Sequence, residues 1–303
     1  MTIMKKVIGI TLIILLALSA GLGVLYTKAE EPVRNVDIES GVSAIDKYQY
    51  FSYGYLEKVT VPSSVQSIGF SAFDGCVSLK DVQLSEGLVT LDNRSFAKCK
   101  SLTSIEIPDS VLTIGNASFY GCSSLENIKL SGSLTKIDNN LFYQCDSLKN
   151  ITIPDSVTQI GQQSFYGCRG LKSLVLPENL LRIEDGAFYE CRNLEAIEVP
   201  SSVNYIGEDA FLGCEKLTIY CESGSYAQKY ARANGLKASA GTILKEDKEM
   251  QGTLENEKVT ANDVPKTGIR KHDWIWFVVI LGAVSGLVLI KRTSRWDQVK
   301  MNR

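Results

Sequence analysis

The residues with the greatest chemical potential in this 303-residue chain are its eight cysteines. Seven of them recur at a constant interval of 23 residues: Cys76, Cys99, Cys122, Cys145, Cys168, Cys191 and Cys214. Zinc needs four converging ligands, which a linear row does not supply. A disulfide needs converging Cβ atoms, whereas equivalent positions of a repeat point in parallel. The spacing therefore favours buried thiols that act as small apolar side chains, and it leaves open a disulfide between Cys214 and Cys221.

Outside the cysteines, the sequence contains few candidate catalytic residues. The single histidine, His272, lies beyond the expected end of the mature protein, so the folded part lacks a histidine general base, metal ligand or pH switch. The sequence has no glycine-rich phosphate loop, and no insertion breaks the repeat where a catalytic pocket would form. We therefore expect a protein that is not an enzyme and that binds no cofactor or metal.

One short motif near the C-terminus is suited to covalent processing. It reads Val264, Pro265, Lys266, Thr267 and Gly268. The apolar stretch Trp274–Ile290 and a basic tail follow it. This order resembles the LPXTG-type sorting signal of Gram-positive surface proteins, with valine in place of leucine and a longer tail. The resemblance implies that a sortase cysteine attacks the Thr267 carbonyl and transfers the chain to a peptidoglycan amine.

The alternative for this C-terminal segment is an ordinary single-pass membrane anchor. Trp274–Ile290 has 17 residues, which is near the lower limit for a helix that crosses a bilayer. At the other end, Lys5 and Lys6 precede an apolar run from Val7 to Leu25. This layout is typical of a secretory signal peptide that is cleaved after Ala29, and an uncleaved signal anchor is its alternative. Both basic ends are expected to stay cytoplasmic, which places the chain between them outside the cell.

Four tyrosines occupy one slot in consecutive copies of the repeat, directly after a phenylalanine. They are Tyr120, Tyr143, Tyr166 and Tyr189. They could form an aromatic stripe that docks an extracellular protein or glycan. They could instead form a ladder that only stiffens the repeat, which the sequence favours. These tyrosines remain the best-placed candidates for a contact surface.

The elements that position these side chains follow from the repeat itself. Phenylalanine keeps the same step at Phe73, Phe96, Phe119, Phe142, Phe165, Phe188 and Phe211. In one copy, Ile151 and Ile153 alternate with polar residues as in a half-buried strand, and Pro154 ends that strand. Residues 164–166 are expected to form a helical turn that inserts Phe165 into the core. No single copy can enclose its apolar residues, so successive coils must stack, at ~4.8 Å per coil, into a β-solenoid about 40 Å long.

A second period of 46 residues overlies the first. The slot after the second apolar leg reads Gly69, Asp92, Gly115, Asp138, Gly161, Glu184 and Gly207. The slot before each cysteine reads Gly75, Lys98, Gly121, Gln144, Gly167, Glu190 and Gly213. The alternation suggests that a two-coil unit was duplicated. Because glycine tolerates positive φ, it predicts tight corners, although Glu184 does not fit that explanation.

The outward-facing strand positions vary from copy to copy. One column reads Lys58, Asp81, Ser104, Asn127, Asn150, Ser173 and Ala196. The other reads Thr60, Gln83, Glu106, Lys129, Thr152, Val175 and Glu198. Such variation suits a broad protein-binding face, and it equally suits neutral change on a solvated surface.

The 23-residue unit, with its recurring phenylalanine and cysteine three residues apart, resembles the BspA-like (Treponema pallidum-type) leucine-rich repeats over roughly Val33–Lys237. The resemblance implies a right-handed leucine-rich-repeat solenoid on a microbial surface, with a role in adhesion. The sequence then divides into a signal peptide (1–29), an N-terminal cap (30–55), seven repeats (56–216) and a C-terminal cap (217–237). In this last cap, Ser225 begins a helix and Gly235 ends it. A flexible polar stalk (238–263) and the sorting segment (264–303) follow.

The charge distribution agrees with a surface protein. The segment between Ala29 and Gly268 carries 22 basic and 32 acidic residues, a net charge of −10, which repels nucleic acid and anionic lipid. We therefore expect an adhesin-like protein at the extracellular face, joined by sortase to the cell wall and binding an extracellular protein or glycan. The alternative is a structural envelope spacer without a dedicated ligand, held in the membrane by Trp274–Ile290.

Overall fold

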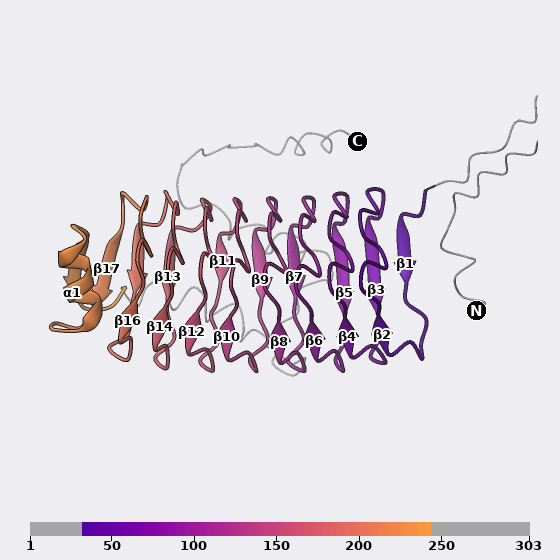
Figure 1. Cartoon of the computed structure of the whole chain (residues 1–303), viewed down its shortest axis with the longest axis horizontal. Coiled ribbons are helices and arrows are strands. Elements are labelled where there is room, and N and C mark those ends of the chain that lie inside the picture. The colour runs from indigo at the N-terminus through magenta and orange to yellow at the C-terminus, as the bar shows by residue number, and fades with distance from the viewer. Residues whose placement is uncertain (1–31, 244–303) are drawn as a thin grey trace, which may run out of the picture. The chain divides into compact units, whose positions relative to one another are not determined.

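The computed structural model describes residues 32–243, which form a parallel β-solenoid (Figure 1). One strand series comprises β1 (Asn35–Asp37), β3 (Lys58–Val61), β5 (Asp81–Leu84), β7 (Ser104–Glu106), β9 (Asn127–Lys129), β11 (Asn150–Ile151), β13 (Ser173–Val175), β15 (Ala196–Glu198) and β17 (Thr218–Cys221). The second comprises β2 (Ala44–Ile45), β4 (Ser67–Ile68), β6 (Thr90–Leu91), β8 (Thr113–Ile114), β10 (Lys136–Ile137), β12 (Gln159–Ile160), β14 (Arg182–Ile183) and β16 (Tyr205–Ile206). The helix α1 (Tyr226–Ala233) and the strand β18 (Lys237–Ala240) complete the described chain.

The register of the strands confirms that one repeat is one coil. Lys58 pairs with Asp81, and Ser67 pairs with Thr90, so neighbouring strands are parallel and offset by one 23-residue unit. The first series forms three sheets, β1-β3-β5, β7-β9-β11 and β13-β15-β17-β18. The second series forms two, β2-β4-β6-β8 and β10-β12-β14-β16. The expected leucine-rich-repeat solenoid of stacked coils is therefore confirmed.

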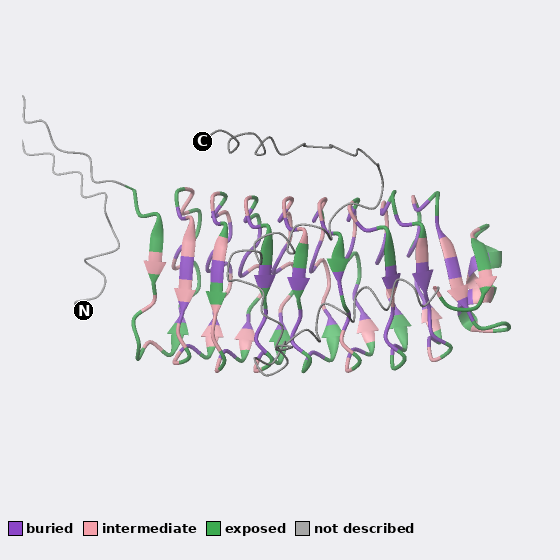
Figure 2. Cartoon of the chain, turned by 180° about the vertical axis from the view of Figure 1, so that it is seen from behind, coloured by how far each residue is buried: buried purple, intermediate pink, exposed green. Residues whose placement is uncertain are grey.

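The core is a column of phenylalanine rings inside the coils. Each ring from Phe73 to Phe211 is buried, and successive ring centroids lie between 5.1 and 6.0 Å apart. Tyr50 extends this column at the N-terminal end, 5.1 Å from Phe73. Buried residues recur at the same places in successive coils, as Figure 2 shows. Burial of these rings, together with the leucine, isoleucine and valine side chains of the same core, supplies stability that a single coil could not provide.

The segment that inserts each phenylalanine is not a helical turn, so that expectation was wrong. Gln163, with φ of 54°, and Gly167, with φ of 69°, lie in the left-handed region on either side of Phe165. The backbone N–H of Phe165 donates to the carbonyl of Ala187 in the next coil at 2.8 Å, and that of Gly167 to Tyr189 at 2.8 Å. Every second N–H of the turn is thus used between coils, which replaces the i to i−4 bonding of a helix.

The two alternating glycine slots have different physical causes. The slot before each cysteine has positive φ in every coil, including Lys98, Gln144 and Glu190, so the predicted corner exists there. The other slot has no positive φ. A Cβ placed on Gly161 would lie 2.8 Å from the backbone nitrogen of Asn139 and 2.6 Å from its Oδ1. Glycine is needed there for close approach between coils.

This close approach explains the period of 46 residues. Asn139 Oδ1 accepts a hydrogen bond from the backbone N–H of Gln162, at 2.8 Å, directly after Gly161. Asn93 does the same for Asn116 at 2.7 Å, and Asp185 for Glu208 at 3.1 Å. One coil therefore supplies a capping side chain and the next supplies a glycine beneath it. Glu184 lies in a coil that supplies such a side chain, Asp185, and its own φ is not positive. A glutamate at this slot therefore needs no special explanation.

The residue before each core phenylalanine gives a test of packing. Ser95 and Ser164 have buried hydroxyls without a hydrogen-bond partner, whereas the hydroxyl of Ser118 donates to Gly115 O at 2.7 Å. Ala187 fills the same slot in another coil, so an alanine fits there. We expect Ser95→Ala and Ser164→Ala each to raise the free energy of unfolding by roughly 1 kcal/mol, and Ser118→Ala to lower it by about as much. Urea unfolding measures the three values, and equal effects at the three serines would contradict this explanation.

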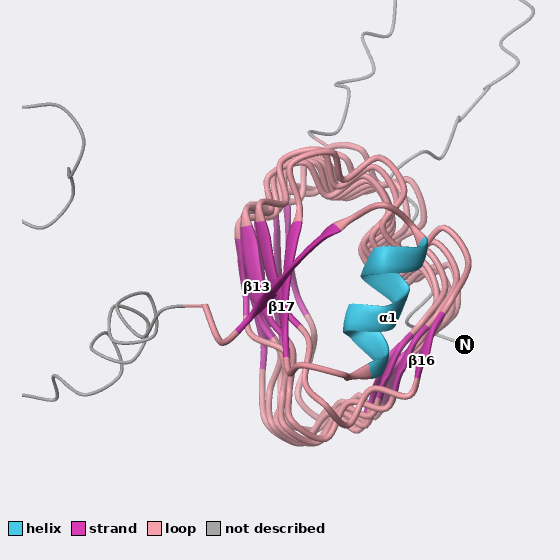
Figure 3. Cartoon of the chain, turned by 90° about the vertical axis from the view of Figure 1, so that its left-hand side faces the viewer, coloured by secondary structure: helices cyan, strands magenta, loops and turns pink. Residues whose placement is uncertain are grey.

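The C-terminal end of the core is covered by α1, which lies across the interior between the two strand series (Figure 3). Ser225 Oγ accepts the N–H of Gln228, and Gly235 has φ of 68°, as the capping residues predict. Ala227 and Ala231 are buried, and Tyr230 packs on Phe211 with ring centroids 6.1 Å apart. Tyr226, the first residue of α1, is exposed.

The chain beyond α1 adds one more rung. Residues 238–240, which the sequence assigned to the stalk, lie in β18, and β18 pairs with β17 in parallel. Over residues 32–243, no helix combines the length and apolar character needed to cross a membrane. The cleavage site at Ala29, the motif Val264–Gly268 and the apolar stretch Trp274–Ile290 lie outside the described residues.

Candidate binding surface

The four tyrosines singled out by their spacing form one continuous stack, which we call the tyrosine stripe. The ring centroids of Tyr120 and Tyr143 lie 4.9 Å apart, those of Tyr143 and Tyr166 lie 4.3 Å apart, and those of Tyr166 and Tyr189 lie 5.1 Å apart. The ring planes are within 10° of parallel. All four residues are half-buried. The structure therefore brings together every residue of the predicted stripe.

The backbone accounts for this stacking. The N–H of Gly121 donates to Tyr143 O at 2.7 Å, and the N–H of Gln144 donates to Tyr166 O at 2.8 Å. These bonds hold successive coils at strand spacing, and equivalent side chains then leave the backbone in parallel. Because the rings cover one another's faces, their edges and hydroxyls are the parts that face solvent.

The phenol of Tyr143 is electrostatically coupled to its two stacked neighbours. The pKa of Tyr143 is raised, first by desolvation, then by the neighbouring Tyr166 and Tyr120, and by a hydrogen bond to Tyr166. The Tyr143 phenol in the middle of the stripe therefore stays neutral at physiological pH. A surface of phenol hydroxyls and ring edges is suited to hydrogen bonds with carbonyl and carboxylate groups of a partner.

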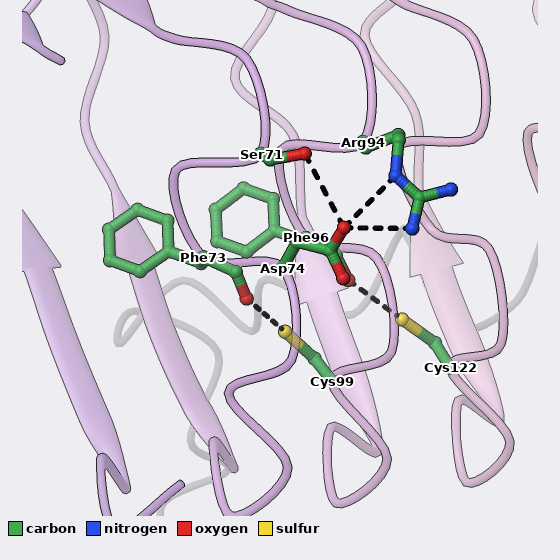
Figure 4. Close-up of polar contacts among 7 residues, drawn as sticks. All are labelled: Ser71, Phe73, Asp74, Arg94, Phe96, Cys99 and Cys122. Carbon is green, nitrogen blue, oxygen red and sulfur yellow. Dashed lines mark hydrogen bonds and ion pairs between the residues drawn. The ribbon is translucent and has the colours of Figure 1, made fainter. Parts of the chain in front are cut away.

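An ion pair that the sequence did not reveal, between Arg94 and Asp74, borders the N-terminal end of the stripe. Figure 4 shows the ion pair itself. The guanidinium of Arg94 lies 5.7 Å from the ring centroid of Tyr120, within the range of a cation–π contact. Its Nε and Nη2 donate to Asp74 Oδ2 at 3.0 and 2.8 Å, and Ser71 Oγ lies 3.4 Å from the same oxygen. Asp74 is 4% exposed, so Arg94 compensates a buried charge while it covers the first ring of the stripe, that of Tyr120.

The cysteines are structural in this part of the chain. Cys99 Sγ donates to Phe73 O at 3.3 Å, and Cys122 Sγ to Phe96 O at 3.2 Å (Figure 4). All eight thiols are buried and free, including Cys214 and Cys221. Burial raises the pKa of Cys122 to about 12, despite a backbone hydrogen bond that lowers it. A thiol with so high a pKa is a poor nucleophile, which confirms the interpretation of the row as core filler.

No metal site accompanies these thiols. Among residues 32–243, no group of three or more histidine, cysteine, aspartate or glutamate side chains is placed to hold a metal ion.

The outward strand columns are partly internal to the fold. Lys58 pairs with Asp81 at 2.9 Å, and Asn150 Nδ2 donates to Asn127 Oδ1 at 2.8 Å, so many of these side chains bind the neighbouring coil. Glu198, expected to face solvent, is buried and accepts the N–H of Ile243 at 3.1 Å. The chain after β18 covers it.

A shallow hollow lies on the same strand face where β5 and β7 are not paired. It measures about 340 Å³ and is lined by Lys80, Asp81, Ser104, Glu106, Asn127 and Lys129 among others. Lys129 and Glu106 form an ion pair at 2.5 Å across this hollow. The charged side chains of its lining include this internal pair, so it is a weaker candidate for a contact surface than the tyrosine stripe.

Comparison with known proteins relates the chain to bacterial repeat proteins. It is similar to a leucine-rich repeat protein of T. pallidum, with 28% identity over 70% of this chain and 88% of that one, at a TM-score of 0.46. It is also similar to a leucine-rich repeat protein of Bacteroides ovatus ATCC 8483, with 21% identity over 69% and 84% of the two chains, at a TM-score of 0.40. A leucine-rich cell surface protein of Faecalibacterium prausnitzii A2-165 is 23% identical over 69% and 83%, at a TM-score of 0.36.

No curated protein matches the chain. The BspA type leucine rich repeat region matches residues 43–169 and 135–226, with six copies. These residues include nearly all the coils described above. The chain belongs to the BspA-type leucine-rich repeat family.

Proposed function

We propose that this protein is an adhesin-like solenoid, displayed outside the cell, which binds an extracellular protein through the tyrosine stripe. The observation that carries the proposal is a rigid row of four half-buried tyrosines, stacked in four successive coils. Tyrosine is enriched at the energetic centres of protein interfaces, because a pre-ordered ring loses little conformational entropy on binding. The backbone bonds between coils supply that order here.

A protein partner fits the stripe better than a glycan does. Sugar rings stack on exposed aromatic faces, and the faces of Tyr143 and Tyr166 are covered by their neighbours in the stack. The hydroxyls and ring edges instead favour backbone carbonyls and carboxylates. The net charge of −10 between Ala29 and Gly268 further disfavours nucleic acid and anionic lipid.

The binding test replaces the two central rings. We expect Tyr143→Ala combined with Tyr166→Ala to weaken binding to immobilised extracellular-matrix proteins or to whole cells by tenfold or more, since buried interface tyrosines contribute about 2 kcal/mol each. Surface plasmon resonance and cell-binding assays measure the loss. Tyr226→Ala is the control, because Tyr226 is exposed but lies on α1, outside the stripe. Circular dichroism should show that the double variant is folded. If a folded double variant binds as tightly as the natural protein, the stripe is not the binding surface.

We also propose that sortase joins the chain to peptidoglycan at Thr267. The motif Val264–Gly268, the apolar stretch Trp274–Ile290 and the basic tail support this anchoring. Cell fractionation followed by mass spectrometry of the C-terminus tests it. A fragment that ends at Thr267 and carries a wall peptide is the expected result, whereas an intact tail in the membrane fraction favours a single-pass anchor.

A structural role as an envelope spacer is the second candidate, and one observation favours it. The stacked rings of the stripe and the hydrogen bonds between coils stiffen the solenoid whether or not a partner binds. In that case, cells that lack the protein should change in wall properties and not in adherence. Comparing adherence and envelope permeability of a deletion strain separates the two roles.

A further inference from the structure

The closest pair in the tyrosine stripe has a geometry suited to covalent coupling. The rings of Tyr143 and Tyr166 are 4.3 Å apart between centroids and within 5° of parallel. Their backbones are tied by the bond from Gln144 N–H to Tyr166 O at 2.8 Å. We propose that Tyr143 and Tyr166 form an oxidative cross-linking site, at which hydrogen peroxide and a haem peroxidase join the two rings as dityrosine.

The chemistry follows from how a tyrosyl radical distributes its unpaired electron. Removal of one electron and the phenolic proton leaves spin density on the oxygen and on the ring carbons beside the C–O carbon. Two such radicals combine through their π faces, and the faces of Tyr143 and Tyr166 are already opposed. Loss of the two ring hydrogens from the bonded carbons to the oxygens then restores both aromatic rings.

The reaction balances without any group from the protein itself. Each phenol gives up one electron and one proton, and one carbon–carbon bond forms between the two rings. The two electrons and two protons reduce one molecule of hydrogen peroxide to two molecules of water through the peroxidase haem. The product is lighter than the two tyrosines by two hydrogen atoms.

The rest of the stripe helps to direct oxidation to this pair. Tyr120 and Tyr189 are stacked on its two sides at 4.9 and 5.1 Å, so an electron removed from an outer ring can be replaced by its inner neighbour. Radicals first formed on Tyr120 or Tyr189 are thus transferred to Tyr143 and Tyr166, the pair with the shortest distance between ring centroids.

Two comparisons within the described chain separate ring stacking from exposure and from proximity. One is an exposed tyrosine without a stacked partner, and the other is a pair of neighbouring tyrosines whose rings are not parallel. Tyr55 is 65% exposed and has no stacked ring partner among the ring contacts of residues 32–243. Tyr50 and Tyr53 lie 5.7 Å apart, but their planes are at 84°, and Tyr50 is buried. If exposure alone determined coupling, Tyr55 would react first. If proximity alone determined it, Tyr50 and Tyr53 would compete.

The consequence of coupling is a covalent bond between two coils that otherwise depend on hydrogen bonds and packing. It would close a loop of one repeat in the middle of the solenoid and restrict the unfolded chain. We expect the cross-linked protein to unfold at a higher temperature than the untreated protein. This inference does not depend on whether the stripe also binds a partner.

The test treats the full chain with horseradish peroxidase and hydrogen peroxide and maps dityrosine by fluorescence and by mass spectrometry of proteolytic peptides. We expect a cross-link between Tyr143 and Tyr166 within monomers, with a yield per molecule that does not depend on protein concentration. Tyr166→Phe keeps the stack and removes one phenol, so it should abolish this cross-link. Tyr53→Phe is the matched control and should leave the yield unchanged.

Two results would overturn the proposal. One is dityrosine that joins Tyr48 or Tyr55 of separate molecules while Tyr143 and Tyr166 remain unmodified. The other is an undiminished yield in Tyr166→Phe. Because both variants keep every ring, circular dichroism should show the native fold in each, and a lost cross-link then reports the chemistry and not unfolding.

Discussion

Raising the pH from 7 to 10 is expected to remove most of the stability of the solenoid, because its row of thiols cannot ionise in the folded state. Burial raises the pKa of Cys76 and Cys122 to about 12 and raises that of Cys99, Cys145, Cys168 and Cys191 from its ordinary value near 9. Desolvation is the largest cause at each of them. The Sγ of each thiol also donates its proton to a carbonyl of the preceding coil, for example Cys145 to Phe119 O at 3.2 Å.

The sign of the effect follows from proton linkage. The folded state keeps its thiol protons, and the unfolded chain releases them above about pH 9, so the stability present below pH 9 is lost as the pH rises towards 12. Each thiol should lower the free energy of unfolding by about 1.4 kcal/mol at pH 10. The six together amount to on the order of 8 kcal/mol, comparable with the whole stability of a typical domain.

Urea unfolding under a reducing agent at pH 7, 9 and 10 measures this loss. The matched variant is Cys145→Ala, which should be less stable than the natural protein at pH 7 because it leaves a cavity. Above pH 9, the free energy of unfolding of the variant should nevertheless fall less steeply than that of the natural protein. The difference between the two slopes should be about 1.4 kcal/mol per pH unit, the contribution of one thiol. Equal slopes for the variant and the natural protein would show that the thiols are not the titrating groups. The tyrosines with raised pKa, such as Tyr50, act in the same direction and are common to both proteins.

The parts of the fold that depend on equivalence between copies could be predicted from the sequence. Constant spacing places Lys58 beside Asp81 and stacks Phe142 on Phe119, because identical side chains in a stack of coils have the same neighbours. The same reasoning identified Cys145 as core filler and aligned Tyr143 with Tyr166. These features need only the period and the polarity of each slot.

The parts that depend on bonds between unlike slots could not be predicted. The residues around Phe165 have the apolar spacing of a helical turn, but the acceptor for its N–H is Ala187 of the next coil. Gly161 lies under the capping side chain of Asn139, and only coordinates reveal that contact. Contacts between different slots of neighbouring coils cannot be predicted from the order of apolar and polar residues within a single copy.

Non-repeated contacts were equally hidden. Arg94 and Asp74 are 20 residues apart and occur as a pair in one place, so the 23-residue period gives no sign of them. Glu198 occupies an outward slot, yet the chain near Ile243 covers it. In the candidate site, the alignment of the stripe was therefore predictable, whereas the cation that covers its first ring was not.

Removing one ring from the middle of the phenylalanine column is expected to have the second-largest effect. Phe142 is fully buried between Phe119 and Phe165, with ring centroids at 5.9 and 5.3 Å. Phe142→Ala should lower the free energy of unfolding by about 3–5 kcal/mol, since it removes buried apolar surface and leaves a cavity that the neighbouring coils cannot fill. Because each coil contacts only its two neighbours, the loss should also weaken the cooperativity between the two halves of the solenoid.

The position of the ring in the column provides the control. Tyr50 fills the same slot in the first coil, where the column continues on one side only, towards Phe73. Tyr50→Ala should therefore cost less than Phe142→Ala and should leave the transition cooperative, because an end coil can detach while the remaining coils stay stacked. Urea unfolding gives both free energies, and hydrogen exchange should show lost protection around residues 119–165 in Phe142→Ala but near residues 45–56 in Tyr50→Ala. Uniform loss of protection along the chain in both variants would mean that stability is shared globally, and that the nearest-neighbour description of this solenoid is wrong.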